Sequence, residues 1–121
     1  MLRELQRHFR FAVPSSRDFS IEIDPRYISA ADVGIYADAG FNRMSLGVQD
    51  FDRDVQVAVN RIQTVEQTLG VIEAARANAF RSVNIDLIYG LPKQTLEGFR
   101  RTLDTVIGVR PERVAIYGYA H

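Results

Sequence analysis

The sequence predicts an α/β fold of about four parallel strands joined by crossover helices, arranged as part of a (β/α) barrel. Segments with a period of two alternate along the chain with segments of helical period, and this alternation is typical of parallel sheets. Each of the first three expected strands has one apolar and one polar face, whereas strands covered by helices on both faces are apolar throughout. The polar faces would therefore line the interior of a barrel.

The first half of the chain is expected to begin with a helix over residues 1–11, followed by an alternating strand over 18–24. Ser29 has the chemistry of an N-cap, and Asp32 three residues later completes the signature of a helix start. This helix is expected to end near Asp38, because Gly40 follows it. The next strand is expected over 42–48.

The second half of the chain continues the same alternation. Asp52 opens a short helix that ends near Val59, and Thr64 with Gln67 forms a capping box for a longer helix. The longer helix is expected to run from Val65 to about Asn78. After it we expect a strand over 82–88 and a turn at 90–92. A helix capped by Thr95 should then run to about Gly108, and a last strand should cover 113–118.

Composition excludes several classes of site. The 121 residues suffice for one domain, and 15 basic and 15 acidic side chains cancel, so no strong field favours nucleic acid or an anionic membrane. The chain has no cysteine, which excludes a disulfide or a cysteine-bound zinc or iron–sulfur site within it. The sequence contains neither a signal peptide nor a run of about 20 apolar residues, so a cytoplasmic location is expected.

Polar residues gather late in the expected strands, where barrel active sites lie. A carboxylate between two apolar strand residues is costly to bury without a partner or ligand, which makes Glu22 and Asp86 candidates for binding. The alternative is that both pair with Arg43 and other interior cations for structural reasons. The residues of this group are Glu22, Asp24, Gln49, Asp50 and Asp86.

Long strings in the sequence carry a more specific indication. The strings 20–25 (SIEIDP), 40–51 (GFNRMSLGVQDF) and 84–95 (NIDLIYGLPKQT) resemble the barrel strands of oxygen-independent coproporphyrinogen III oxidases, which are radical S-adenosylmethionine enzymes. Residues 59–63 and 117–121 resemble further segments of these enzymes. A related branch of haem chaperones shares the barrel strings, but Gln-Asp-Phe at 49–51 and Val-Asn-Arg at 59–61 look like the oxidase branch.

The resemblance implies roles for particular residues. Glu22 would bind one S-adenosylmethionine molecule. Gln49, Arg61 and Asp86 would contact a second one, and Ala120 would offer backbone contacts beside it. These residue types suit the ligand, because carboxylates accept from hydroxyls or an ammonium group and arginine can bind a carboxylate bidentately.

The resemblance also implies cofactors and a reaction for the full-length family. A [4Fe–4S] cluster cleaves S-adenosylmethionine to a 5′-deoxyadenosyl radical, and two propionates of coproporphyrinogen III are oxidatively decarboxylated to give protoporphyrinogen IX. The cluster-binding Cys-x-x-x-Cys-x-x-Cys loop of the family is missing from residues 1–121. The chain would therefore supply strands three to six of a radical-S-adenosylmethionine-type TIM barrel, without the cluster-binding and C-terminal parts, and would be inactive alone.

Four expectations remain open on the sequence. The chain could instead derive from a haem-chaperone homologue, or it could be a barrel fragment that binds S-adenosylmethionine without turnover or serves only a structural role. Four strands of an intended barrel also leave two unpaired edges, so the isolated piece is expected to self-associate.

Overall fold

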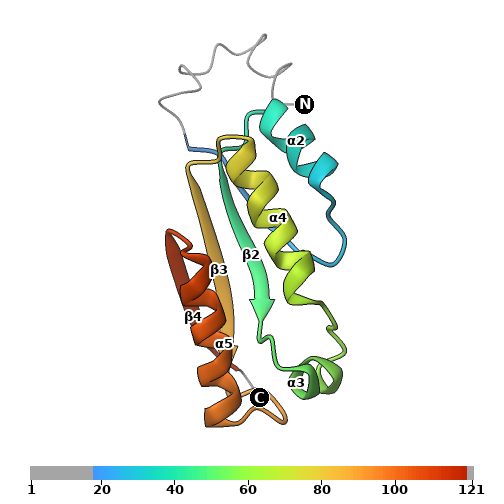
Figure 1. Cartoon of the computed structure of the whole chain (residues 1–121), viewed down its shortest axis with the longest axis vertical. Coiled ribbons are helices and arrows are strands. Elements are labelled where there is room, and N and C mark those ends of the chain that lie inside the picture. The colour runs from blue at the N-terminus through green and yellow to red at the C-terminus, as the bar shows by residue number, and fades with distance from the viewer. Residues whose placement is uncertain (1–17, 120–121) are drawn as a thin grey trace.

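The computed structural model describes residues 18–119, so the helix expected over residues 1–11 and the candidate Ala120 lie outside the described residues. One sheet contains all four strands in the order β1-β2-β3-β4, and each neighbouring pair is parallel (Figure 1). The predicted α/β arrangement of about four parallel strands is confirmed. The strands are β1 (Ser20–Ile23), β2 (Arg43–Gln49), β3 (Ser82–Tyr89) and β4 (Arg113–Gly118).

The connections between the strands are helical, as a parallel sheet requires. α2 and α4 pack side by side, and α3 lies at the end of the sheet to which β2 points (Figure 1). Among the described residues, no helix has the length and apolar character needed to cross a membrane. The helices are α2 (Ala30–Asp38), α3 (Arg53–Ala58), α4 (Val65–Ala77) and α5 (Leu96–Val109).

Local capping fixes where the helices begin. The Ser29 hydroxyl accepts from the Asp32 backbone N–H, and the Asp32 carboxylate accepts in return from the Ser29 N–H at 2.9 Å. Thr64 and Gln67 form the same reciprocal pair at the start of α4. Each box satisfies backbone donors that the first helical turn leaves free, and both were predicted from sequence spacing.

The core lies between the helices and one face of the sheet. Side chains along β2 alternate between buried and half-buried positions, so this strand presents a single apolar face, as its sequence predicts. That face packs with apolar residues of β3, α4 and α5. The central buried residues are Met44, Leu46 and Val48 of β2, Ile85 and Leu87 of β3, Ile72 and Ala75 of α4, and Val106 of α5.

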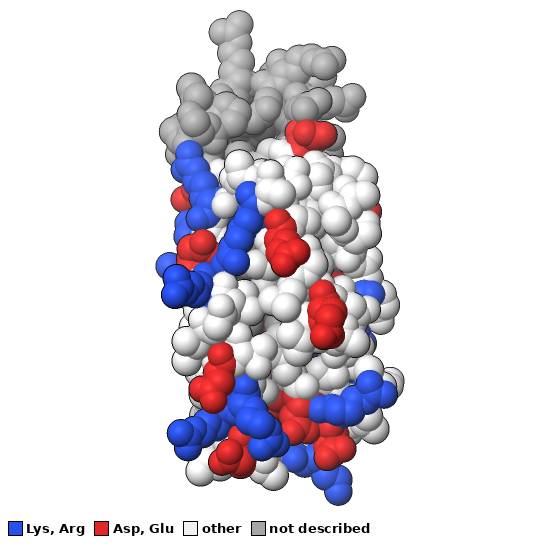
Figure 2. All heavy atoms as spheres, viewed as in Figure 1, with Lys and Arg blue, Asp and Glu red and all other residues white. Residues whose placement is uncertain are grey.

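The outer strands differ from the two central ones. β1 and β4 are the edges of the sheet, and β4 is exposed along almost all of its length. Its exposed apolar side chains include Ile116 and Tyr117. On the face seen in Figure 2, acidic and basic side chains are interspersed, with no broad area of a single sign.

Candidate functional site

The candidate residues lie on the face of the sheet opposite the helices. In the parallel register, Glu22 of β1 lies opposite Ser45 of β2, and Gly47 of β2 lies opposite Asp86 of β3. Residues paired across parallel strands point to the same face, so these side chains surround the position of Gly47. Three consecutive strands therefore contribute to one site.

An open cavity of about 280 Å³ occupies this position. It contains four of the five residues that the sequence singled out, brought together from three strands and the segment between α3 and α4. The fifth, Ala120, lies outside the described residues. The residues lining the cavity are Glu22, Ile23, Asp24, Ser45, Gly47, Gln49, Arg61 and Asp86.

Arg61 is the cation of the cavity. Its Nη2 donates to the carbonyl oxygen of Gly47 at 2.7 Å and lies 3.5 Å from a carboxylate oxygen of Asp24. Its Nε atom is buried and has no hydrogen-bond partner among the described residues. A buried donor without an acceptor is unfavourable, and a ligand oxygen in the cavity would satisfy it.

Gly47 leaves the space that Arg61 occupies. A Cβ atom at this position would lie 2.9 Å from Arg61 Nη2, closer than such atoms approach in folded proteins. The glycine therefore allows the guanidinium to lie directly against the β2 backbone, between the strands that carry Glu22 and Asp86.

Gln49 ends β2 in an unusual conformation. Its φ is +70°, a left-handed value that costs a non-glycine residue about 1–2 kcal/mol. The register with β3 is irregular at the same point: Gly47 lies opposite Asp86, but Gln49 lies opposite Leu87. This bulge turns the end of β2 and places Gln49 at the cavity wall.

Asp24 is held by a second arginine. Arg26 Nη2 lies 2.7 Å from Asp24 Oδ2, and Arg26 Nε donates to the same carboxylate at 3.0 Å. The side-chain hydrogen bond from Arg26 lowers the pKa of Asp24, and the charge of Arg61 contributes in the same direction. Asp24 therefore stays ionised and keeps Arg61 at the cavity.

Asp86 has the opposite electrostatic environment. Burial raises its pKa, and the negative charge of Glu22 raises it further. Among the described residues, no ion pair or hydrogen bond joins Asp86 to a cation. The sequence alternative was that Glu22 and Asp86 pair with Arg43 and other interior cations; its Arg43 part is wrong, because Arg43 pairs instead with Asp18 at 3.1 Å.

Two details differ from the sequence expectations. Glu22 is exposed rather than buried, so the cost of a buried charge applies to Asp86 alone. Asp50, expected among the polar residues of the strand ends, is 1% exposed and faces α5, away from the cavity. Its partners are the Thr102 hydroxyl and the Gln94 amide, which compensate the buried charge.

Sequence reasoning gave no role to Gly47, and it placed Asp24 among the polar residues late in the strands without assigning it a contact. Gly47 could have been noticed as the residue without a side chain in the polar series of β2. The contact between Asp24 and Arg61 has no sequence signal, because 37 positions separate the two residues and only the fold joins them.

The chemistry of the cavity fits S-adenosylmethionine. Glu22 and Asp86 offer carboxylate acceptors for ribose hydroxyls or an ammonium group, whereas Arg61 Nε offers a donor that has no partner among residues 18–119. An iron–sulfur cluster does not fit these residues. The chain contains no cysteine, and the described residues include no group of three histidine, cysteine or acidic side chains that could hold a metal.

Comparisons with known proteins find relatives of this chain. An oxygen-independent coproporphyrinogen III oxidase of Pseudomonas aeruginosa is 50% identical over all of this chain, which spans 26% of that relative. The enzyme of the same name from Helicobacter pylori strain J99 is 48% identical over 86% of this chain, which spans 23% of it. The chain thus corresponds to about a quarter of the length of these relatives.

Solved structures show the same fold. The structure of coproporphyrinogen III oxidase from Escherichia coli, described as a radical SAM enzyme, is 44% identical, with a TM-score of 0.91 over 99% of this chain and 27% of that one. A radical S-adenosylmethionine methyltransferase from Kitasatospora setae, 17% identical, has a TM-score of 0.78 over 97% of this chain and 24% of its own. The second likeness concerns the fold alone.

The match to a family covers most of the sequence. The sequence profile of the Radical SAM superfamily matches residues 1–106, and the four parallel strands superpose on part of the barrel in the Escherichia coli enzyme. The predicted partial barrel is confirmed. The chain belongs to the Radical SAM superfamily.

Proposed function

We propose that this chain is part of an oxygen-independent coproporphyrinogen III oxidase and that its cavity binds S-adenosylmethionine. The observation that carries the proposal is the convergence of Glu22, Gln49, Arg61 and Asp86, distant in sequence, on one cavity. Relatives that are 50% and 48% identical bear the name of this enzyme. The proposed reaction converts two propionates of coproporphyrinogen III to vinyl groups and gives protoporphyrinogen IX in haem biosynthesis.

The residues of this chain would bind and orient the ligand. Glu22 would accept hydrogen bonds from one S-adenosylmethionine molecule, whereas Asp86 and Gln49 would contact a second. Arg61 would bind a ligand carboxylate, since its Nε is an unused donor at the cavity. When bound, S-adenosylmethionine would supply the hydrogen-abstracting chemistry, and Ala120 would contribute through its backbone.

The rest of the activity would depend on other parts of the protein. The chain would supply strands three to six of the barrel, while cysteines outside these 121 residues would hold the [4Fe–4S] cluster. The isolated chain would then be inactive, since it has no cluster ligand of its own. A cytoplasmic location remains the prediction.

Calorimetric titration of S-adenosylmethionine into the full-length protein tests the site. Glu22→Ala and Asp86→Ala should each weaken binding by about 1–3 kcal/mol, the range for a lost hydrogen bond to a charged group. Glu73→Ala removes an exposed carboxylate of α4, outside the cavity, and should bind like the parent protein. Equal affinities for all of these variants would refute the assignment.

A measurement of catalytic turnover tests whether the full-length protein carries out the proposed reaction. The reduced full-length holoenzyme should convert coproporphyrinogen III to protoporphyrinogen IX under anaerobic conditions, and Asp86→Ala should slow the conversion. Stable binding of haem without any conversion would instead support the haem-chaperone alternative. Binding of S-adenosylmethionine with neither property would support a non-catalytic barrel.

We also propose that the chain made alone self-associates. In the part of the chain that the structure describes, β1 and β4 each pair with a neighbour on one side only, and β4 carries exposed apolar side chains such as Ile116. Such edges favour pairing with another strand.

A further inference from the structure

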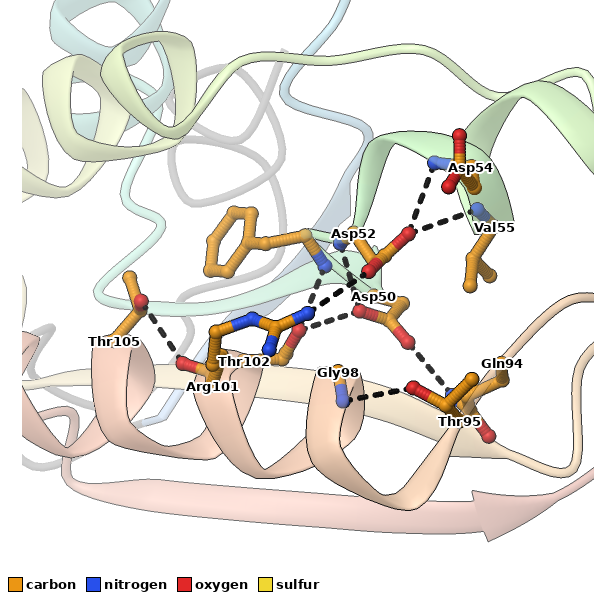
Figure 3. Close-up of polar contacts among 11 residues, drawn as sticks. Asp50, Asp52, Asp54, Val55, Gln94, Thr95, Gly98, Arg101, Thr102 and Thr105 are labelled. Atoms are coloured by element: carbon orange, nitrogen blue, oxygen red, sulfur yellow. Dashed lines mark hydrogen bonds and ion pairs between the residues drawn. The ribbon is translucent and has the colours of Figure 1, made fainter.

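Asp50 is a buried carboxylate that connects the end of β2 to α5 and to the loop between β3 and α5. The Thr102 hydroxyl donates to its Oδ1, as does the Asp52 backbone N–H at 2.8 Å. Gln94 Nε2 donates to Oδ2 at 2.8 Å, so both oxygens are engaged from different segments (Figure 3). A buried carboxylate with this many donors has one favourable position.

Gln94 extends this connection to the end of β3. Its Nε2 also donates to the carbonyl oxygen of Ile88 at 2.8 Å, and its Oε1 accepts from the Gly90 backbone N–H. Both the nitrogen and the oxygen of the Gln94 side-chain amide therefore make hydrogen bonds, which fixes the orientation of the amide. Through it, Asp50 ties the end of β2 to the end of β3, the two strands that carry Gln49 and Asp86.

The two carbonyl groups that flank Gln49 are also held by buried side chains. Gln63 Nε2 donates to the Val48 carbonyl at 2.7 Å, and Gln56 Nε2 donates to the Asp50 carbonyl at 3.0 Å. The Asp50 backbone N–H donates to the Val48 carbonyl at 2.9 Å, which closes a tight turn around Gln49. The strained residue is therefore fixed on both sides.

This turn decides where Gln49 lies. In a regular register, with Gly47 opposite Asp86, Gln49 would lie opposite Ile88, but it lies opposite Leu87. One register position corresponds to about 3.3 Å along a strand. The turn therefore draws Gln49 toward Asp86 and the cavity that both residues line.

We propose that Asp50 is a positioning residue for S-adenosylmethionine binding, which acts by holding Gln49 in its left-handed conformation at the cavity. Gln56 and Gln63 support it through the two flanking carbonyl groups. Asp50 itself touches no ligand, since it faces α5. This inference rests on the proposed function, namely that the cavity takes S-adenosylmethionine.

A double-mutant cycle on the full-length holoprotein tests the inference, with S-adenosylmethionine affinity measured by calorimetric titration. Asp50→Asn keeps the size of the side chain but presents an amide N–H₂ to the Gln94 donor, so the network breaks. Asp50→Asn and Gln49→Ala should each weaken binding about tenfold. The double variant should bind no more weakly than Gln49→Ala, because Asp50 acts through Gln49.

Two threonine-to-valine substitutions on α5 provide a test variant and its control. Thr102→Val removes the hydroxyl that donates to Asp50 and should also weaken binding, whereas Thr105→Val removes a hydroxyl that donates only to the Arg101 carbonyl and should not. Figure 3 shows the two threonines on the same helix. If Asp50→Asn does not fold, Thr102→Val replaces it in the cycle.

The outcomes separate this inference from the proposed function. Additive losses in the double variant would show that Asp50 supports the fold in general, and they would overturn the positioning role while leaving the site intact. Unchanged binding by Gln49→Ala would overturn the positioning role, whereas the site itself stands or falls with Glu22→Ala and Asp86→Ala. Equal effects of the two threonine variants would also contradict the inference.

Discussion

Asp86 lies half-buried on β3, where burial and the charge of Glu22 raise its pKa above the ordinary value of 3.8. A group whose pKa is raised on folding stabilises the fold fully below its unfolded pKa, and this contribution is lost as the pH rises through the folded pKa. At neutral pH, the charged Asp86 therefore disfavours folding. Such a residue suits a site that is completed by a ligand.

Asp86→Asn should raise the free energy of unfolding of the full-length protein at neutral pH while weakening S-adenosylmethionine binding. The gain should shrink as the pH falls through the raised pKa of Asp86 and should be gone below the ordinary value of 3.8, where the carboxyl group is protonated in both the folded and the unfolded state. Denaturant unfolding across this pH range measures the difference. Asp104→Asn makes the same change at an exposed position of α5, outside the cavity, and is the matched control. A parent protein more stable than Asp86→Asn at neutral pH would contradict the account.

The pKa of Asp24 is lowered rather than raised, so its contribution to stability should depend on pH in the opposite sense to that of Asp86. Arg26→Ala removes the hydrogen bonds that lower the pKa of Asp24, so this pKa should rise toward its ordinary value. The stabilisation that a lowered carboxyl pKa provides is present above the unfolded pKa and is lost as the pH falls through the folded one. Carboxyl-carbon NMR titration reads the pKa directly. Arg100→Ala should leave it unchanged, and a pKa that stays low in Arg26→Ala would show that Arg61 alone is sufficient.

At the scale of elements, β2 combines a regular apolar face with an irregular end. Residues 44–48 follow the alternation of a strand, and Gly47 makes room for Arg61 before the bulge at Gln49. The same strand thus serves the core on one face and the cavity on the other. A change at Gly47 should affect the cavity much more than the fold.

Gly47→Ala should displace the Arg61 guanidinium, because the new Cβ would lie 2.9 Å from Nη2. The displaced group is the far end of a flexible side chain, so we expect a clear loss of S-adenosylmethionine affinity with little change in stability. Gly70→Ala is the matched control: nothing lies within 4 Å of the added Cβ on α4, and alanine should stabilise the helix by roughly 0.5–1 kcal/mol. Thermal unfolding and calorimetric titration measure both effects, and equal affinities for the two variants would refute the role of Gly47.

The sequence predicted helix starts and strand faces well, because these depend on residues close together in the chain. The capping boxes at Ser29 and Thr64 depend on residues three positions apart, and the apolar faces of the strands follow a period of two. The left-handed Gln49 could not be predicted, because its conformation is fixed by Gln56 and Gln63 rather than by its own type. The burial of Asp50 likewise depends on Thr102, 52 positions away.

At the scale of the whole molecule, the parallel topology explains why candidate residues from separate strands line one cavity. Strands that run in the same direction end at the same edge, so Glu22 and Asp86 were expected to lie near one another once the fold class was known, whereas Gln49 reaches the cavity through the bulge at the end of β2. Within residues 18–119, the same topology leaves β1 and β4 at the two edges of the sheet. The cavity is therefore formed largely by β1, β2 and β3, whereas β4 carries exposed apolar residues.

The 121-residue chain made alone should form dimers or larger species through these edges. Ile116→Lys places a charge on the β4 edge strand and should shift the population toward monomer. Ile107→Lys makes the same change at an exposed position of α5 and should not. Light scattering coupled to size-exclusion chromatography measures the masses. A monodisperse monomer of the unaltered chain would contradict this expectation.

The central claim is that S-adenosylmethionine occupies the cavity between β1, β2 and β3. A crystal structure of the full-length protein with S-adenosylmethionine tests it most directly. The account predicts ligand density within hydrogen-bonding distance of Glu22 and Asp86, with Arg61 Nε paired to a ligand oxygen. Ligand density elsewhere, with these three side chains unchanged and Arg61 Nε still without a partner, would contradict it.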